Sequence, residues 1–139
     1  MNSGKGWRGY LFSRDMGGQV IPHRVQNLVI RDAAQKNGCP FLLSAVEYAM
    51  PGSFMILKSL IEERDQVDGL VFYNTHQLPV NHDLRLALYQ AFPKQQKGLL
   101  FALENLLVTD EGGIALLEDI LLCRRLSWRF DQPLPLGSR

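Results

Sequence analysis

Four short apolar runs recur along the chain, and each is followed by a polar or turn-rich stretch and then by a segment with helical periodicity. The runs are Gly9–Phe12, Phe41–Val46, Leu70–Tyr73 and Leu99–Leu103. Such alternation is the pattern of repeated strand–helix units. Because the runs are apolar on both faces, we expect a mostly parallel sheet of four or five strands with helices on both sides.

Turn-forming residues predict where the intervening helices begin and end. The first helix is expected to begin near Pro22 and to stop at Asn37–Gly38. The second opens after Pro51, and Asn81 is a suitable cap for the third. A final amphipathic helix is expected around Leu117. The apolar face predicted for the first helix comprises Ile21, Val25, Leu28, Val29 and Ala33.

One domain accounts for the length of the chain. Its 139 residues are 46% hydrophobic, and a chain of this size can bury roughly two-thirds of its unfolded surface in one core. Residues 1–125 are therefore expected to form a single α/β domain. Residues 126–139 contain Trp128 and Phe130 and show no helical period. We expect this segment to be a docking arm, and the protein to be a homodimer or a higher homo-oligomer.

Charge and cysteine usage limit the classes of partner. The chain has 15 Lys and Arg against 14 Asp and Glu, a formal net charge of +1 without a basic block, so no nucleic-acid partner is expected. Cys39 and Cys123 have no second cysteine or histidine at ligand spacing, which predicts neither a metal site nor a disulfide framework. No apolar stretch approaches the ~20 residues of a membrane span, and no signal segment precedes the first run. We expect a cytoplasmic protein with no membrane partner.

Polar residues follow the predicted strands, where an open parallel sheet binds its ligands. Glu47 and His76 are the candidates for proton transfer, because burial near a strand end can tune the pKa of a carboxyl or an imidazole. In the alternative interpretation Glu47 pairs with Arg14 and His76 is a solvated loop residue. Arg14 could bind a carboxylate or phosphate through two parallel hydrogen bonds. The remaining candidates are Ser13 as a catalytic hydroxyl and Ser44, Tyr48, Tyr73 and Asn74 as substrate-binding groups.

Four segments resemble the sporadic carbohydrate cluster protein family. They are GYLFSR (Gly9–Arg14), VQNLVIRD (Val25–Asp32), LSAVEYAM (Leu43–Met50) and QLP (Gln77–Pro79), and together they cover nearly the whole chain. The family consists of small bacterial proteins encoded among genes for surface-carbohydrate biosynthesis and has no settled activity. The resemblance implies a role in glycan or nucleotide-sugar metabolism. It directs attention to Ser13, Arg14, Glu47 and Tyr48, which lie inside these segments.

The order of elements more loosely resembles the catalytic domain of serine recombinases, in which a serine supported by several arginines attacks a DNA phosphate. Ser13, the segment Glu47–Ser53 and Glu104 carry this resemblance. The recombinases place an arginine two residues before the serine, where this chain has Leu11, and further arginines in the loop after the third strand, where residues 74–79 have none. The resemblance implies a three-layer, resolvase-like or flavodoxin-like α/β fold, without support for phosphodiester cleavage.

Together these observations predict an acid/base enzyme of the isomerase, epimerase or lyase type. This reaction type is expected because proton-transfer candidates occur without a P-loop, a dinucleotide fingerprint or another cofactor motif. We therefore expect no cofactor. The resemblance to the carbohydrate cluster family implies that the substrate is a sugar or nucleotide sugar, and Arg14 suggests that it is anionic. The alternative is a non-catalytic module that binds a sugar nucleotide or a partner enzyme on the same scaffold. A degenerate DNA recombinase is a third interpretation, which the net charge and the missing arginines disfavour.

Overall fold

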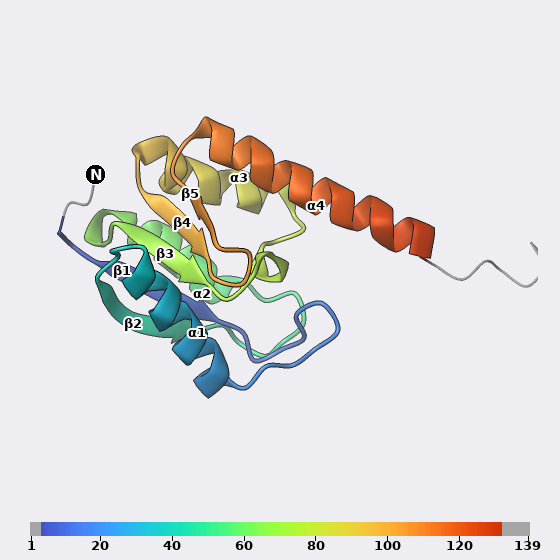
Figure 1. Cartoon of the computed structure of the whole chain (residues 1–139), viewed down its shortest axis with the longest axis horizontal. Helices are drawn as coiled ribbons and strands as arrows, with labels where there is room; N and C mark the ends of the chain where they lie inside the picture. The colour runs from blue at the N-terminus through green and yellow to red at the C-terminus, as the bar shows by residue number, and fades with distance from the viewer. Residues whose placement is uncertain (1–3, 132–139) are drawn as a thin grey trace, which may run out of the picture.

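The computed structural model describes residues 4–131, and within them five strands form one sheet in the order β2-β1-β3-β4-β5 (Figure 1). β1 pairs in parallel with β2 and β3, and β3 with β4, whereas β5 is antiparallel to β4. The mostly parallel sheet expected from the apolar runs is confirmed, with β5 as an added edge strand. The strands are β1 (Trp7–Leu11), β2 (Phe41–Val46), β3 (Gly69–Phe72), β4 (Gly98–Phe101) and β5 (Leu106–Val108).

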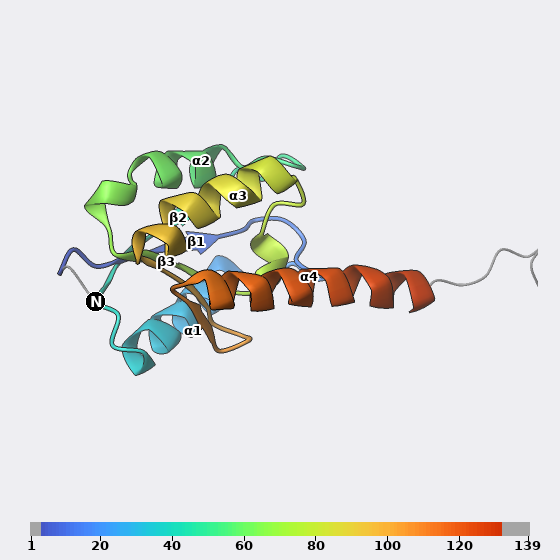
Figure 2. The same ribbon diagram turned by 90° about the horizontal axis from the view of Figure 1, so that it is seen from above.

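Helices flank the sheet on both sides, which confirms the predicted α/β class. α1 (His23–Lys36) lies on one face, and α2 (Met55–Glu62) and α3 (His82–Ala91) lie on the other (Figure 2). α4 (Glu111–Asp131) begins beside β5 and extends beyond the rest of the domain in both views. Three short 3₁₀ turns complete the described elements: η1 (Arg64–Gln66), η2 (Thr75–Gln77) and η3 (Pro93–Gln95).

The buried face of α1 differs from the apolar stripe predicted for it. Gln26 and Ile30 are fully buried, whereas Val25 and Leu28 are 42% and 63% exposed. The buried amide of Gln26 donates from Nε2 to the carbonyl oxygen of Phe12 at 2.7 Å and accepts the Phe12 N–H at 3.0 Å. A buried amide with hydrogen-bond partners carries little penalty. The prediction was wrong for Val25 and Leu28, because it treated only apolar residues as core-facing; Ile21, Val29 and Ala33 pack against the core as predicted.

The C-terminal helix also differs from the prediction. α4 continues through Leu126 to Asp131, so a non-helical segment beginning at residue 126 is wrong for residues 126–131. These turns project from the domain (Figure 1), and Leu126 and Ser127, the last residues of α4 whose burial the structure describes, are exposed. The side chains of Trp128 and Phe130, and residues 132–139, lie outside what the structure describes. The division into a domain of residues 1–125 and an arm remains a prediction.

The core is closed at the amino ends of the central strands. The indole of Trp7 lies across Gly69 and Gly98, where an added Cβ would come within 2.4 and 2.1 Å of the ring. Further along the same strands, the rings of Phe72 and Phe101 stack with centroids 4.9 Å apart. This packing leaves the carboxyl ends of the strands as the open edge of the sheet.

Candidate functional site

Two cavities lie where the loops after β1, β2 and β3 come together. The first, of about 800 Å³, is bounded by the loops after β1 and β2 and by α2 and α3; the second, of about 620 Å³, lies between residues 17–18, residues 75–80 and α4. His76, Leu78 and Val80 line both cavities, so the two adjoin at His76. Lining residues peculiar to the first include Phe12, Arg14, Phe54, Lys58 and Asn81. Those peculiar to the second include Gly17, Thr75, Arg85, Glu118, Arg124 and Arg125.

Glu47 follows β2 and is 1% exposed, with its carboxylate turned toward the start of α2. It accepts hydrogen bonds from the N–H groups of Ile56 at 3.2 Å and Leu57 at 3.1 Å, which the helix itself leaves without partners. The hydroxyls of Tyr10, at 2.7 Å, and Ser53, at 3.1 Å, also donate to it. Glu47 therefore joins β1 to the N-terminus of α2.

The same contacts determine the ionisation of Glu47. Burial raises the pKa of this carboxyl, but the hydrogen bond from Tyr10 and those from backbone N–H groups outweigh burial, so the pKa lies below its ordinary value. Burial, reinforced by the hydrogen bond to Glu47, raises the pKa of Tyr10 well above its usual range. Glu47 is thus a carboxylate at neutral pH whose oxygens are already occupied, an arrangement suited to holding the loop in place.

Arg14 reaches the first cavity from the loop after β1. Its Nη1 donates to the carbonyl oxygen of Tyr48 at 3.1 Å, and its guanidinium carbon lies 4.1 Å from the ring centroid of Phe12 and 4.9 Å from that of Phe54. Among the described residues it forms no ion pair with Glu47. These contacts fix the guanidinium at the cavity wall and leave donors for an anionic ligand.

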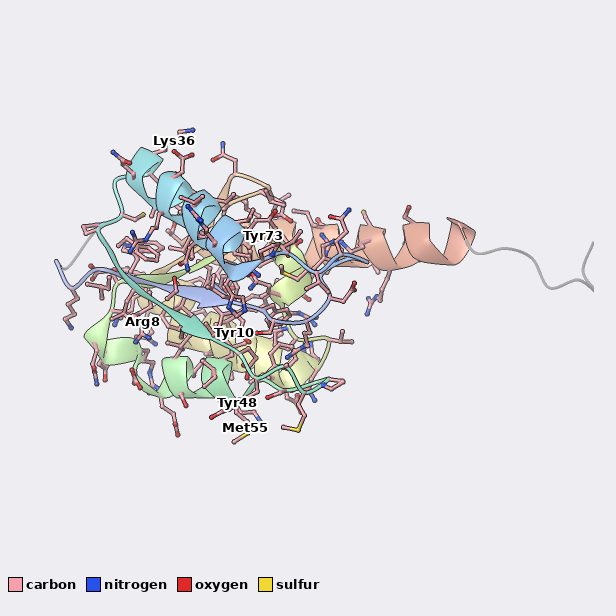
Figure 3. All side chains as sticks on the ribbon, turned by 90° about the horizontal axis from the view of Figure 1, so that it is seen from below. Arg8, Tyr10, Lys36, Tyr48, Met55 and Tyr73 are labelled. Carbon is pink, nitrogen blue, oxygen red and sulfur yellow. The ribbon has the colours of Figure 1, made fainter. Side chains whose placement is uncertain are left out.

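The remaining candidates of the first two strands lie outside the cavities. Ser13 Oγ is 2.8 Å from Nε2 of His23, an exposed hydroxyl–imidazole pair. Tyr48 is 52% exposed and lies at the surface near α2, whereas Tyr10 is in the interior (Figure 3). Ser44 lies within β2 and donates to Oδ1 of Asn27 on α1 at 2.5 Å, so it joins helix to strand and does not reach the site.

The loop after β3 is held by its own side chains. Asn74 is nearly buried and its Oδ1 accepts the N–H of His76 at 3.0 Å. Gln77 is fully buried; its Oε1 accepts the N–H of Tyr73 at 2.7 Å, and its Nε2 donates to the carbonyl oxygen of Tyr10 at 2.9 Å. Tyr73 and Asn74 therefore support the loop, and neither lines a cavity.

His76 is an exposed residue of this loop and the titratable group that lines both cavities. Partial burial lowers the pKa of the imidazole, the positive charge of Arg124 lowers it further, and the carboxylates of Glu104 and Asp15 act in the opposite direction. The net pKa lies below the ordinary histidine value. At neutral pH the ring is therefore uncharged and can accept a proton.

Sequence reasoning missed a polar group behind His76. Oε2 of Glu104 accepts the N–H of Thr75 at 3.0 Å and its hydroxyl at 2.8 Å, and Arg124 donates to the same hydroxyl. The other oxygen of Glu104 is buried without a hydrogen-bond partner in the described chain. The sequence points to Glu104 through its position after the fourth strand and through the recombinase resemblance, but it assigns no role to Thr75 or Arg124. Local sequence carried no indication that these segments meet.

Two classes of feature are absent from the described residues. None of the helices within residues 4–131 is both long and apolar enough to cross a membrane. Over the same range, three or more His, Cys, Asp or Glu side chains do not gather as a metal site would require.

Comparisons with known proteins show the fold. No family model matches the chain, and no curated protein sequence matches it. Among solved structures, the N-terminal catalytic domain of TP901-1 integrase matches with a TM-score of 0.55 at 15% identity, over 90% of this chain and 99% of that chain. The expected likeness to the serine recombinase catalytic domain is thus confirmed at the level of fold. These comparisons give no support to the resemblance to the sporadic carbohydrate cluster family, which remains a prediction from the residues.

Proposed function

We propose that this protein is a cofactor-independent acid/base enzyme that moves a carbon-bound proton of an anionic sugar or nucleotide sugar. The reaction would be of the isomerase, epimerase or lyase type, in the cytoplasmic biosynthesis of a bacterial surface carbohydrate. The observation that carries this proposal is the position of His76, an exposed imidazole with a lowered pKa at the junction of two cavities. A neutral imidazole beside a ligand-sized cavity is suited to general-base catalysis.

In the proposed reaction, His76 takes a proton from a carbon next to a C=O group of the sugar, which is the aldehyde or ketone of an open-chain hexose phosphate, or a keto or carboxylate group of a nucleotide sugar or uronic acid. The electron pair of the broken C–H bond moves to the carbonyl oxygen, and the imidazolium returns its proton to carbon or to a leaving group. Arg14, held against Phe12 and Phe54, binds the anionic group of the sugar in the first cavity. Glu47 keeps the neighbouring loop in place and transfers no proton, because five groups already donate to its oxygens.

Deuterium incorporation tests all three reaction types at once, since each exposes a carbon-bound proton to solvent. Uronic acids, hexose phosphates and nucleotide sugars are incubated with the protein in D₂O, and the products are analysed by NMR and mass spectrometry. The wild type should incorporate deuterium at a carbon of one class of sugar. His76→Gln should lower the rate by about 100-fold or more.

His82→Gln is the matched control, because His82 lies in the first turn of α3 and lines neither cavity. This variant should retain the wild-type rate. Equal rates in the wild type and His76→Gln would remove His76 from the mechanism. A sugar that binds without incorporating deuterium would support the non-catalytic binding module instead.

We do not carry the activity named for the integrase over to this chain. A net charge of +1 gives little counterion release from DNA. The hydroxyl of Ser13 is paired with His23 and lines neither cavity. We propose instead that nucleic acid is not a partner.

We further propose that the protein assembles with copies of itself through α4. This helix projects from the domain (Figure 2), and its Leu116, Leu122 and Leu126 are 49%, 44% and 42% exposed. Exposed leucines on a projecting helix favour burial against a second copy. Light scattering should show a concentration-dependent oligomer that Leu126→Glu weakens. A wild-type protein that stays monomeric at high concentration would contradict this proposal.

A further inference from the structure

The second cavity carries an excess of positive charge. Arg85, Arg124 and Arg125 line it, and Glu118 is its one lining carboxylate among the described residues. Glu104 stands behind Arg124, 3.9 Å from its Nη2, and does not line the cavity. With His76 uncharged, the three arginines and the carboxylates of Glu118 and Glu104 together leave one net positive charge at this cavity. Whether the excess serves a ligand depends on which guanidinium donors are already used.

The fold uses four of the five N–H donors of Arg85. Its Nε and Nη2 donate to the two oxygens of Glu118 at 2.6 and 2.8 Å, and its Nη1 donates to the carbonyl oxygens of Pro79 and Val80 at 3.1 and 3.2 Å. Tyr89 also donates to Glu118, at 2.5 Å. This paired arrangement joins α4 to α3 and leaves Arg85 one N–H, on Nη2, for a ligand.

Arg124 lies on the same helix and in the same cavity, yet it is used differently. Its Nη2 donates to the hydroxyl of Thr75, which orients the guanidinium. Within the described part of the chain, its Nε and Nη1 donate to no acceptor. The side chain is two-thirds buried, with 33% of its surface exposed. A partly buried guanidinium with unused donors is favourable only if an acceptor or water completes it.

Arg125 adds a second available cation. It is exposed and lines the cavity, and it forms no ion pair with any described residue. Opposite the two arginines, the turn at Gly17 lies so close to His76 that an added Cβ would be 2.7 Å from Nε2. The volume of about 620 Å³ is in the range of small-molecule sites.

We propose that the second cavity binds a phosphate or diphosphate group of the substrate through Arg124 and Arg125. Guanidinium groups bind phosphate oxygens through paired, charge-assisted hydrogen bonds, and Arg124 is already oriented by Thr75. This inference rests on the proposed function, because it places the sugar ring, with any carboxylate that Arg14 binds, in the first cavity and the phosphate in the second, with His76 between them. The substrate is then a sugar phosphate or a sugar nucleotide.

The test is calorimetric titration with inorganic pyrophosphate, which needs no turnover. Arg125→Gln should weaken pyrophosphate binding roughly tenfold or more, the loss expected for hydrogen bonds to a charged group. Arg124→Lys keeps the charge beside Glu104 but removes the paired donors, and it should weaken binding to a similar extent. Urea unfolding of each variant shows whether the fold is intact.

Arg31→Gln is the matched control, because Arg31, on α1, lies over the ring of Phe41 of β2 and lines neither of these cavities. It should bind pyrophosphate as the wild type does. Wild-type affinity in Arg125→Gln, or absence of binding to the wild type at millimolar pyrophosphate, would overturn the proposal. Loss of binding in Arg14→Gln alone would place the anion in the first cavity and would also overturn it.

Competition titrations identify the source of the phosphate group, and a comparison with deuterium incorporation separates the phosphate subsite from the proposed reaction. Pyrophosphate, glucose 1-phosphate and a UDP-sugar should compete for one site, whereas duplex DNA that displaces pyrophosphate at physiological salt would show a nucleic-acid site and overturn the inference. Failure of deuterium incorporation with pyrophosphate binding retained would overturn only the proposed reaction. Deuterium incorporation without pyrophosphate binding would overturn only the phosphate subsite.

Discussion

Glu47 and His76 both follow a parallel strand at the same edge of the sheet, yet the structure uses them differently. Glu47 is 1% exposed and its oxygens accept five donors, whereas the His76 ring is exposed and makes no hydrogen bond to any described residue. The difference arises from the next element, since α2 begins at Met55 with its N-terminus against Glu47, and the N–H groups of its first turn need an acceptor. A polar residue at a strand end is therefore a functional candidate only when no nearby helix N-terminus requires it.

The strongest test of this contrast is Glu47→Gln. The variant keeps the shape of the side chain but replaces one acceptor oxygen with a donor, which leaves Tyr10, Ser53 or the first N–H groups of α2 without partners. We expect the free energy of unfolding to fall by about 3 kcal/mol, measured by urea denaturation. Glu62→Gln, at the exposed end of the same helix, should change it by less than about 0.5 kcal/mol. Similar small effects in both variants would contradict the anchoring role.

The pH dependence of the stability difference between the wild type and Glu47→Gln tests the ionisation of Glu47. Because the folded-state pKa of Glu47 lies below its unfolded value, its stabilising contribution is complete above the unfolded value and is lost as the pH falls through the folded one. The stability gap between wild type and Glu47→Gln should be constant from pH 7 to 5 and should shrink below about pH 4.3. Urea denaturation across this range measures it. A gap that stays constant down to pH 3 would be inconsistent with a lowered pKa.

A smaller effect is expected from the turn that contacts His76. Gly17 and Gly18 both have left-handed φ values, of 64° and 93°, so alanine at either should cost about 1–2 kcal/mol of stability. An added Cβ at Gly17 would meet the His76 ring, whereas at Gly18 it meets nothing within 4 Å. Gly17→Ala should therefore also shift the His76 ring resonances in NMR spectra and slow deuterium incorporation. Equal NMR shifts in both variants would show that the turn does not position the imidazole.

Ser13→Ala should have the smallest effect on stability, within about 0.5 kcal/mol, since the pair with His23 is exposed. Its effect on deuterium incorporation decides whether Ser13 belongs with His76 or with the supporting residues. Because Ser13 lines neither cavity, we expect less than a threefold change, roughly 0.6 kcal/mol in the barrier. A loss as large as that of His76→Gln would return Ser13 to the catalytic group.

The sequence predicted the sheet because burial on both faces leaves continuous apolar runs in β3 and β4. It predicted the Asn81 cap, whose side chain accepts the N–H of Leu84 at 2.9 Å, because capping is local. It misplaced Val25 and Leu28 of the first helix, because the buried position there is Gln26, whose hydrogen-bond partners come from the loop after β1. Apolar periodicity does not encode such contacts.

The candidate site was predictable only in part, for a similar reason. Arg14 and His76 line the cavities as their positions after strands suggested. Ser44 was placed at the strand end by its sequence neighbours, but it lies within β2, where it pairs with Asn27. Glu104 and Arg124 both form hydrogen bonds with Thr75 across long sequence separations, and no local sequence motif predicts such contacts.

The two buried glutamines, Gln26 and Gln77, have a consequence for how the loops can move. Each accepts a backbone N–H just past the end of a strand, that of Phe12 or that of Tyr73. Those two amide hydrogens should exchange with solvent on the slow timescale of the sheet, although neither belongs to its ladder. Backbone movement in the two loops can therefore begin only after Phe12 and after Tyr73, whose N–H groups the glutamines hold. Ligand entry can change the conformation of the loops around His76 while the strands before them stay hydrogen-bonded in the sheet.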